Sequence, residues 1–355
     1  MTLLSTDTRP LVSVCMAICN EEKYLTDTLK SIQAQTHENF EVLIFDNNST
    51  DQTVSICRDF CQADGRFKLY QNTFNVGQVY NFNRCLAPAS ADFIAIRSGN
   101  DLIEPRYLEK TLSLLLDDPA MGLAYTRSLK IDPDGALLDN DYPDDSYFET
   151  TCSDPVAAGT EVMRCFIHPA PYFGLYRKGL LDRLQPLRHI FGSDKIFICE
   201  ASLYSSIGCV AESLSHERRH QRQASLRGIF SKDAVYQIPQ KSIFARFETT
   251  APFTDMIWGF TDMFSRAAIG NREKSQLCHN AHSMFFDHYQ RQLASEKQRV
   301  LDIFENNRDH LLRDETHRIL NLNRHHLLHR VTRMLFIYPS DADLKALAHK
   351  LAALL

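Results

Sequence analysis

The first hundred residues alternate between short apolar runs and segments with helical periodicity. The runs over 11–19 and 40–45 are nearly continuous and rich in Val, Ile and Phe, and two further strands are expected over 67–71 and 93–96. A continuous apolar run of this length is typical of a strand buried on both faces. Between the first two runs, Leu25, Leu29 and Ile32 recur at helical spacing. The alternation, with its short connections, predicts βαβ units and a doubly wound, mostly parallel sheet of the α/β class.

One helix start in the first hundred residues can be predicted from capping residues. We expect Ser49 or Thr50 to N-cap a helix over 54–61, because their hydroxyls can accept from free backbone N–H groups.

The middle of the chain is less regular than its beginning. A helix is predicted over 197–207, with Gly208 as its C-cap and a short strand over 210–214.

Beyond about residue 225 the strand patterns disappear. Helical periodicity then covers residues 253–268, 274–306, 309–321, 325–336 and the segment after Pro339. We therefore expect an α/β domain over residues 1–228, followed by an α-helical C-terminal domain over 229–355.

Composition narrows the functional class. The chain has 355 residues with a formal net charge of −5, 44% hydrophobic residues and only 13 Gly and 13 Pro, which excludes a disordered or collagen-like chain. Nucleic acid is not an expected partner, since such binders carry a basic excess. The ten cysteines form no CxxC pair, and we expect free thiols in a reducing cytoplasm. No signal peptide or membrane-spanning run is recognisable.

Polar residues follow each predicted strand, at 17–21, 46–51, 72–77 and 97–101. In an open parallel sheet, ligands bind beyond the carboxyl ends of the strands. Neither a GxGxxG nor a GxxxxGK[ST] motif is present, so a dinucleotide-binding Rossmann site and a P-loop are not predicted. Carboxylates at these positions could hold a phosphorylated ligand through a bridging Mg²⁺ or Mn²⁺.

The residues at these strand ends resemble the opening of family 2 glycosyltransferases with the GT-A fold. The family pattern runs roughly VSV-hh-P-x-Y-N, then S-I-x-x-Q-T, then E-hhh-x-D-x-x-S-x-D-x-T, then N-x-G. This chain matches it at Asn20, Leu25, Ser31, Ile32, Gln35, Thr36, Glu41, Asp46, Ser49, Asp51, Thr53, Asn75 and Gly77, and the Asn and strand that follow in the family match Asn81 and Phe93–Ile96. The resemblance covers about residues 10–225. It implies a Rossmann-like GT-A domain with a nucleotide-binding half (1–101) and an acceptor half (102–228).

The resemblance also implies how a nucleotide-sugar would bind. Asp46 would be the carboxylate that recognises the nucleotide base, and Asn75 and Gly77 would shape the loop that closes over the nucleotide. The wall beside base and ribose would come from Ala17, Cys19, Asn20 and Glu21. Plain turns, with Asp46 as a turn-stabilising cap, are the structural alternatives.

The metal motif departs from the family pattern. Where the family has D-x-D-D or x-D-D, this chain has Ser98-Gly99-Asn100-Asp101. Asp101 aligns with the usual metal ligand, whereas Asn100 replaces a carboxylate and can contact ribose without bringing a charge. We therefore expect a weakly bound Mn²⁺ or Mg²⁺, and a metal-independent enzyme is an alternative.

The catalytic base of the family is the Asp of an x-E-D motif before a helix. Asp194 stands in the matching place, and Ser193 replaces the common Glu. Inverting transfer needs such a carboxylate to take the proton of the acceptor hydroxyl. Asp194 could also N-cap the helix that follows, and Glu200 is the alternative acid.

A basic stretch over 217–222 completes the predicted site. By resemblance, Arg218 or Arg219 would neutralise the leaving diphosphate, and His220 or His216 would complete the metal shell. A solvated basic loop is the structural alternative. For the amphipathic stretch 325–333, three uses are open: packing on the catalytic domain, a homodimer interface, or contact with an anionic membrane at the cytoplasmic face.

These observations predict an inverting glycosyltransferase that moves a sugar from a UDP- or dTDP-sugar to a hydroxyl of a glycan, lipid-linked saccharide or protein. The alternative hypothesis is a nucleotide-sugar-binding or scaffold protein with degenerate motifs, because Asn100 and Ser193 stand where the family has carboxylates. Acceptor choice is expected to depend on residues 132–172.

Overall fold

The structure is a computed structural model of the 355-residue chain. It describes residues 9–139, 142–165, 170–219, 252–306, 328, 331–335, 337–338 and 340–352. These residues divide into two compact units. The first comprises residues up to His189 and from Phe197 to 219, and the second comprises Ile190–Ile196 and the described residues from 252 onward. The predicted boundary at 228/229 lies outside the described residues.

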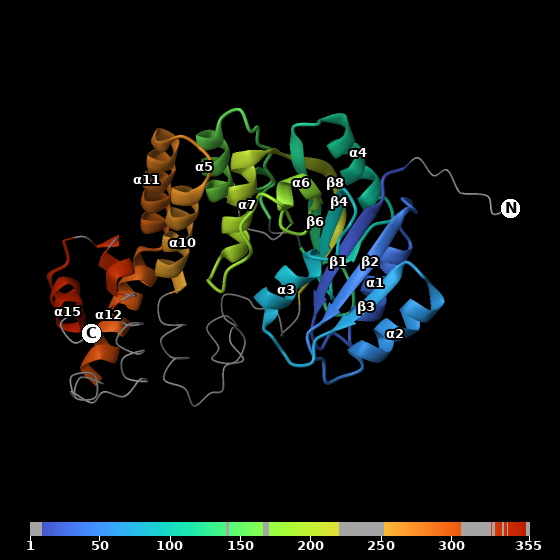
Figure 1. The fold of residues 1–355 in the computed structure, drawn as a ribbon, viewed down its shortest axis with the longest axis horizontal. Helices are drawn as coiled ribbons and strands as arrows, with labels where there is room; N and C mark the ends of the chain where they lie inside the picture. The colour runs from blue at the N-terminus through green and yellow to red at the C-terminus, as the bar shows by residue number, and fades with distance from the viewer. Residues whose placement is uncertain are drawn as a thin grey trace. The chain divides into compact units, whose positions relative to one another are not determined.

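An eight-stranded mixed sheet forms the centre of the first unit (Figure 1), in the order β3-β2-β1-β4-β7-β6-β8-β5. Its strands are β1 (Val12–Ile18), β2 (Phe40–Asp46), β3 (Phe67–Gln71), β4 (Phe93–Arg97), β5 (Leu102–Ile103), β6 (Met121–Ile131), β7 (Leu175–Arg177) and β8 (Ser206–Arg218). β1 to β4 are mutually parallel, β7 is antiparallel to both its neighbours, and β6 pairs with β8 in parallel. The four expected apolar strands are thus confirmed, and the sheet is mostly parallel.

Helices cover both faces of this sheet. They are α1 (Leu25–Gln33), α2 (Thr53–Ala63), α3 (Gln78–Leu86), α4 (Tyr107–Asp117), α5 (Pro155–Cys165), α6 (Lys178–Leu181) and α7 (Ser193–Tyr204), with a 3₁₀ turn over Asp144–Ser146. Alternate residues of β1, such as Val14 and Met16, pack in one core with α1 and α4. Cys15 points to the other face, where it contacts Cys85 of α3. The period of two in a strand therefore gives β1 two apolar faces, as a central strand requires.

The second unit is helical. It contains α10 (Pro252–Arg266), α11 (Asn271–His288), α12 (Gln290–Asn306) and α15 (Ala342–Ala352). The fully buried Glu296 accepts hydrogen bonds from the backbone N–H groups of Phe253 and Thr254, at 2.8 and 3.0 Å, and so caps α10 from α12. The segment 309–321 and most of 325–333 lie outside the described residues. None of the described helices combines the length and apolar character that crossing a bilayer requires.

Three local predictions are wrong. Gly208 lies inside β8 instead of capping a helix, and a Cβ there would come within 2.6 Å of the Met121 side chain. The helix expected over 274–306 is interrupted at Tyr289, between α11 and α12. Gln52, not Ser49 or Thr50, is the N-cap of α2, because the Ser49 hydroxyl bonds Asp46 instead. Tertiary packing thus overrode local capping signals.

All ten cysteines are free thiols, as expected. Five of them are buried and five are intermediate in exposure. The fold of the described residues therefore contains no disulfide bond.

Candidate functional site

The carboxyl ends of β1, β2 and β3 meet at one edge of the sheet. Ile18 is in register with Asp46, and Asp46 with Gln71. The residues that follow these strands are therefore neighbours in space, although they lie about 28 residues apart in the chain. The sequence-based expectation that polar strand ends converge holds for this edge.

Asp46 is completely buried and holds the turn after β2. Its carboxylate accepts hydrogen bonds from the Ser49 backbone N–H, at 3.1 Å, and from the Ser49 hydroxyl. Asn20 N–H donates to the Ser49 hydroxyl at 2.8 Å, and Glu21 N–H donates to Thr53 Oγ1 at 2.7 Å. Asn20, Glu21 and Asp46 thus join the loop after β1 to the turn after β2.

Four asparagines form a hydrogen-bonded network, the amide cluster, consisting of Asn47, Asn72, Asn75 and Asn81. Asn47 Nδ2 donates to Asn75 Oδ1 at 2.8 Å, and Asn72 Nδ2 donates to Asn47 Oδ1 at 3.1 Å and to Asn81 Oδ1 at 2.9 Å. Sequence analysis singled out Asn75 but missed Asn47 and Asn72 as site residues. Their position directly after β2 and β3 was the signal that could have found them.

The amide cluster shapes the loop before α3. Asn47 Oδ1 accepts from Val76 N–H at 2.9 Å, and Asn75 Oδ1 accepts from Gly77 N–H at 2.9 Å. Gly77 has φ +86°, a conformation that favours glycine. Arg84 of α3 also donates through Nη1 to Asn72 Oδ1 at 2.5 Å, so the amides and one guanidinium together hold the loop.

Cys19 and Ala17 lie beside this loop at the end of β1, and both are partly exposed. Asn75 Nδ2 lies 3.7 Å from the Cys19 sulfur. Burial, reinforced by the neighbouring Asp46, raises the pKa of the Cys19 thiol. Cys19 is therefore a neutral, weakly polar wall at neutral pH.

A second network, the charged cluster, lies where β4 and β8 end, and comprises Asp101, Lys130, Tyr142, Glu217, Arg218 and Arg219. Asp101 Oδ2 accepts from the Ser98 hydroxyl at 2.6 Å, and Oδ1 accepts from Arg218 N–H at 2.9 Å. Asp101 is 8% exposed, so its carboxylate is largely enclosed. The structure thus brings Asp101 to the basic stretch that the sequence predicted beside it.

Arg218 is not part of a solvated loop. It is the last residue of β8 and 2% exposed. Its guanidinium donates to the carbonyls of Asn100, at 3.0 Å, and Pro133, at 2.9 Å, and stacks 4.9 Å from the Tyr24 ring centroid. Arg218 therefore braces the turn at Asn100, and its predicted contact with the diphosphate stays a prediction. This corrects the solvated-loop alternative.

Arg219 lies in the same cluster but is more exposed, with 37% of its side chain accessible. It bonds the Tyr142 hydroxyl and Glu217, and Lys130 lies 3.9 Å from the Tyr142 ring centroid. Burial raises the pKa of Glu217 and lowers the pKa of Lys130. Both shifts follow from the cost of burying a charge. His220 lies outside the described residues, and His216 pairs with Glu104 at 2.8 Å.

The fit of a divalent cation to these residues depends on Asp101. Within the described part of the chain, no three His, Cys, Asp or Glu side chains gather around a common point. Mg²⁺ is commonly held by one or two carboxylates together with substrate phosphates and water. The donor set therefore fits a cation shared with a diphosphate, and not one ligated by protein alone.

Asp194 lies in the first turn of α7, which begins at Ser193 and so earlier than the predicted helix over 197–207; Asp194 is therefore inside the helix instead of before it. Burial raises the pKa of its carboxyl, although Lys195 opposes this. Asp194 belongs to the second unit, whereas the strand ends belong to the first. Its place at the strand ends stays a prediction. Glu200, the alternative acid, is 4% exposed and accepts from Gln185 N–H at 3.1 Å.

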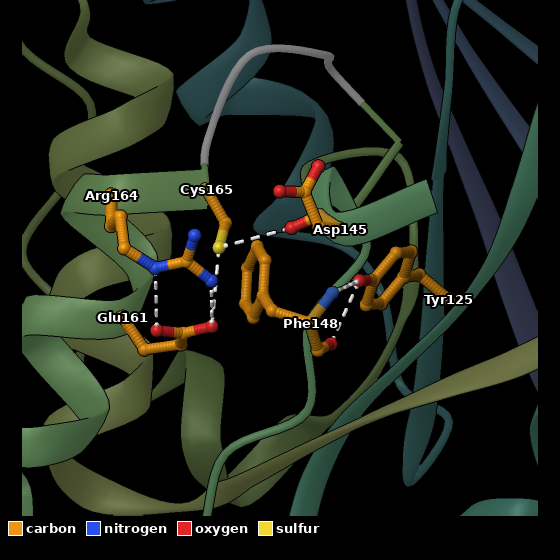
Figure 2. A network of polar contacts seen from close by, with 6 residues as sticks. All are labelled: Tyr125, Asp145, Phe148, Glu161, Arg164 and Cys165. Atoms are coloured by element: carbon orange, nitrogen blue, oxygen red, sulfur yellow. Dashed lines mark hydrogen bonds and ion pairs between the residues drawn. The ribbon is translucent and has the colours of Figure 1, made fainter. Parts of the chain in front are cut away.

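The part of the first unit that the sequence predicts to bind the acceptor is held by a separate network (Figure 2). Tyr125 of β6 donates to the Phe148 carbonyl and accepts from Phe148 N–H, both at 2.8 Å. On α5, Glu161 binds Arg164 at 2.7 Å, and the Cys165 thiol contacts Glu161 and the Asp145 carbonyl. The 144–148 segment is thus pinned to β6 and α5, which places part of the predicted acceptor region on a fixed support.

Comparisons with known proteins agree with this fold. Residues 13–164 match the family model "Glycosyl transferase family 2". The putative glycosyltransferase EpsE of Bacillus subtilis is 39% identical over 107 residues, covering 30% of this chain and 38% of EpsE. The putative glycosyltransferase EpsH of the same organism is 27% identical over 263 residues, covering 69% of each protein. The chain thus spans well under half the length of EpsE.

Among solved structures, S. aureus TarS 1–349 in complex with UDP superposes with a TM-score of 0.56. It is 16% identical and covers 93% of this chain and 92% of the TarS chain. At this identity the likeness shows the fold, which is GT-A-like with a helical C-terminal region. Residues 13–164, which match the model of glycosyl transferase family 2, lie within this fold, and the chain is similar to proteins of that family.

Proposed function

We propose that the protein is an inverting glycosyltransferase that uses a UDP- or dTDP-sugar. The observation that carries the proposal is the presence of two polar networks at the strand ends of a domain that matches the family 2 model: the amide cluster and the charged cluster around Asp101. The acceptor would be a hydroxyl of a glycan, lipid-linked saccharide or protein. Relatives named as glycosyltransferases support the activity.

The donor is proposed to lie across both clusters. The base and ribose would contact the wall at Ala17 and Cys19 and the amide cluster, with Asp46 acting through the turn it holds. Asn100 and Asp101 would face the ribose and the diphosphate. UDP and UDP-GlcNAc are bound by the structural neighbour TarS, which supports a uridine diphosphate donor.

Charge on the diphosphate must be balanced as the sugar departs. Asp101 would hold a divalent cation, which when bound supplies positive charge to the phosphate oxygens. Arg219, with its part-exposed guanidinium, would add a second positive group, while Arg218 keeps the Asn100–Asp101 turn in place.

Asp194 is proposed as the general base. Its carboxylate would accept the proton of the acceptor hydroxyl while that oxygen forms a bond to the anomeric carbon. The bond from the anomeric carbon to the diphosphate oxygen breaks on the opposite face, so the configuration inverts. A raised pKa suits this task, because a more basic carboxylate takes a proton more readily.

The Asp194→Asn variant tests the base. We expect transfer to fall by about 10²–10⁴-fold, the usual contribution of a general base, with UDP binding in calorimetry unchanged. The exposed Asp182, paired with Lys178 at 2.7 Å, provides a control as Asp182→Asn. Near-normal turnover of Asp194→Asn would show that another group is the base.

A nucleotide-sugar-binding or scaffold protein is the second candidate. Asn100 and Ser193 favour it, since both stand where the family has carboxylates. A thermal-shift screen of UDP-, dTDP- and GDP-sugars, with and without Mn²⁺, identifies the donor. Binding without any turnover would support this candidate, whereas slow hydrolysis of several nucleotide-sugars would argue against it. A homodimer or membrane contact through the C-terminal helices stays a prediction.

A further inference from the structure

The segment Gln185–His189, here called the connecting segment, links α6 to α7 and is bound to α3. Asn83 of α3 donates through Nδ2 to the Leu187 carbonyl at 2.9 Å, and its Oδ1 accepts from Leu187 N–H at 3.0 Å. One side chain thus satisfies both backbone groups of a single residue, as a neighbouring strand would. An amide is the neutral side chain that can donate and accept in this way.

A second contact joins the connecting segment to the loop before α3. The His189 ring lies 5.1 Å from the Tyr80 ring, centroid to centroid. A Cβ at Gly77 would lie 3.5 Å from His189 Cε1, so the imidazole also covers Gly77. Gly77 follows Asn75 of the amide cluster by two residues. The connecting segment therefore contacts the loop that is proposed to close over the nucleotide, so a movement of one would affect the other.

The other end of the connecting segment is tied to α7. Gln185 N–H donates to Glu200 of α7 at 3.1 Å. Asp194 lies in the first turn of that helix, seven residues after Leu187. The nucleotide loop, α3, the connecting segment and α7 are thus joined by consecutive contacts and by the chain itself.

We propose that Asn83 is a positioning residue, which couples closure of the nucleotide loop to the placement of α7 and of Asp194. The inference rests on the proposed function, since it needs nucleotide at the amide cluster and a base at Asp194. When the loop settles around a nucleotide, α3 is held with it, and the paired amide bonds hold Leu187 in turn. Without Asn83 the nucleotide would still bind, but α7 would no longer respond.

Hydrogen–deuterium exchange of residues 185–196, with and without UDP and Mn²⁺, tests the coupling directly. In the wild-type protein we expect UDP to slow exchange in this segment. In Asn83→Ala we expect that slowing to be lost while the calorimetric Kd for UDP stays within about twofold. Asn83→Asp keeps the acceptor for Leu187 N–H but loses the donor, so it should retain part of the slowing.

Kinetics provide the second measurement, with the UDP-sugar that the donor screen identifies. We expect kcat of Asn83→Ala to fall about tenfold or more with little change in donor KM, because a misplaced base costs rate more than binding. Asn39→Ala is the matched control, since Asn39 is a half-buried residue whose side-chain amide donates to the Arg9 carbonyl at 2.7 Å, away from α3 and the connecting segment.

The outcomes separate this inference from the proposed function. Equal UDP-dependent slowing in wild type and Asn83→Ala, or none in the wild type despite UDP binding, would overturn the coupling alone. Failure of every nucleotide to bind would overturn the proposed function and the coupling with it. A purely structural Asn83 would lower Tm in the variant but leave the UDP-dependent slowing intact.

Discussion

The two clusters at the sheet edge are built from opposite kinds of side chain. The amide cluster, after β2 and β3, contains four neutral asparagines that bond one another. The charged cluster, after β4 and β8, combines Asp101 and Glu217 with Lys130, Arg218 and Arg219. Neutral amides offer directed donors and acceptors without a net field, whereas clustered charges set a local potential.

This difference indicates that the two clusters would bind different parts of one donor, the amide cluster its base and ribose and the charged cluster its diphosphate. A nucleotide base and ribose are uncharged and are recognised by the direction of hydrogen bonds. A diphosphate carries negative charge and is held by cations and metal. Changes that remove charge from one cluster, or add charge to the other, therefore test whether this difference is functional.

Among changes within the two clusters, the largest effect is expected from Asp101→Asn in the charged cluster. The variant keeps the size of the side chain but removes the one carboxylate proposed to hold the metal, so we expect transfer to fall about 100-fold. Mn²⁺-dependent UDP binding, measured by calorimetry with Mn²⁺ or EDTA, should weaken as well.

The matched control for that variant is Asp117→Asn, at the exposed end of α4. If wild type and Asp101→Asn bind UDP equally tightly, with and without EDTA, Asp101 does not hold the metal.

A smaller effect is expected when charge is added to the amide cluster by Asn47→Asp. The new carboxylate cannot donate to Asn75 and lies directly after the buried Asp46. We expect about 1–3 kcal/mol of lost stability in urea unfolding and weaker UDP binding, because a buried hydrogen bond is replaced by repulsion.

Asn48→Asp is the control, since Asn48 is the exposed next residue and its φ of +59° is tolerated by Asp. If Asn47→Asp binds UDP as tightly as Asn48→Asp does, a neutral cluster is not required for nucleotide binding.

The smallest effect concerns the pH dependence of stability at Glu217. Burial raises its pKa above the unfolded value, so the native state holds this proton more tightly than the unfolded chain does. The contribution to the free energy of unfolding is then fully present below the unfolded pKa and is lost as pH rises through the native pKa. Relative to Glu217→Gln, wild type should lose stability from about pH 4 upward.

Urea unfolding of both proteins at several pH values measures this difference. The exposed Glu212, paired with Lys110, serves as the control substitution Glu212→Gln. A stability difference between wild type and Glu217→Gln that does not vary with pH would show that Glu217 keeps an ordinary pKa.

Much of the fold could be predicted because its signals are local. β1, β2 and β4 are apolar runs between polar turns, and burial on both faces demands such a composition, whereas the edge strand β3 is only partly buried. The position of Asp101 after the fourth strand followed from the same pattern. The prediction for Gly208 was wrong because glycine is favoured both at a helix C-cap and where packing leaves no room for a Cβ. The contact with Met121, which only the tertiary structure shows, identifies the second role.

The sequence by itself determined which residues are strands, which are turns, and therefore which side chains stand at strand ends. Only the tertiary structure decided what those side chains do. Ser49 was available as a helix cap but bonds Asp46, and Arg218 was predicted in a basic loop but is buried against Asn100. Hydrogen-bond partners far apart in the chain depend on strand register and burial, and neither is encoded within a short window of residues.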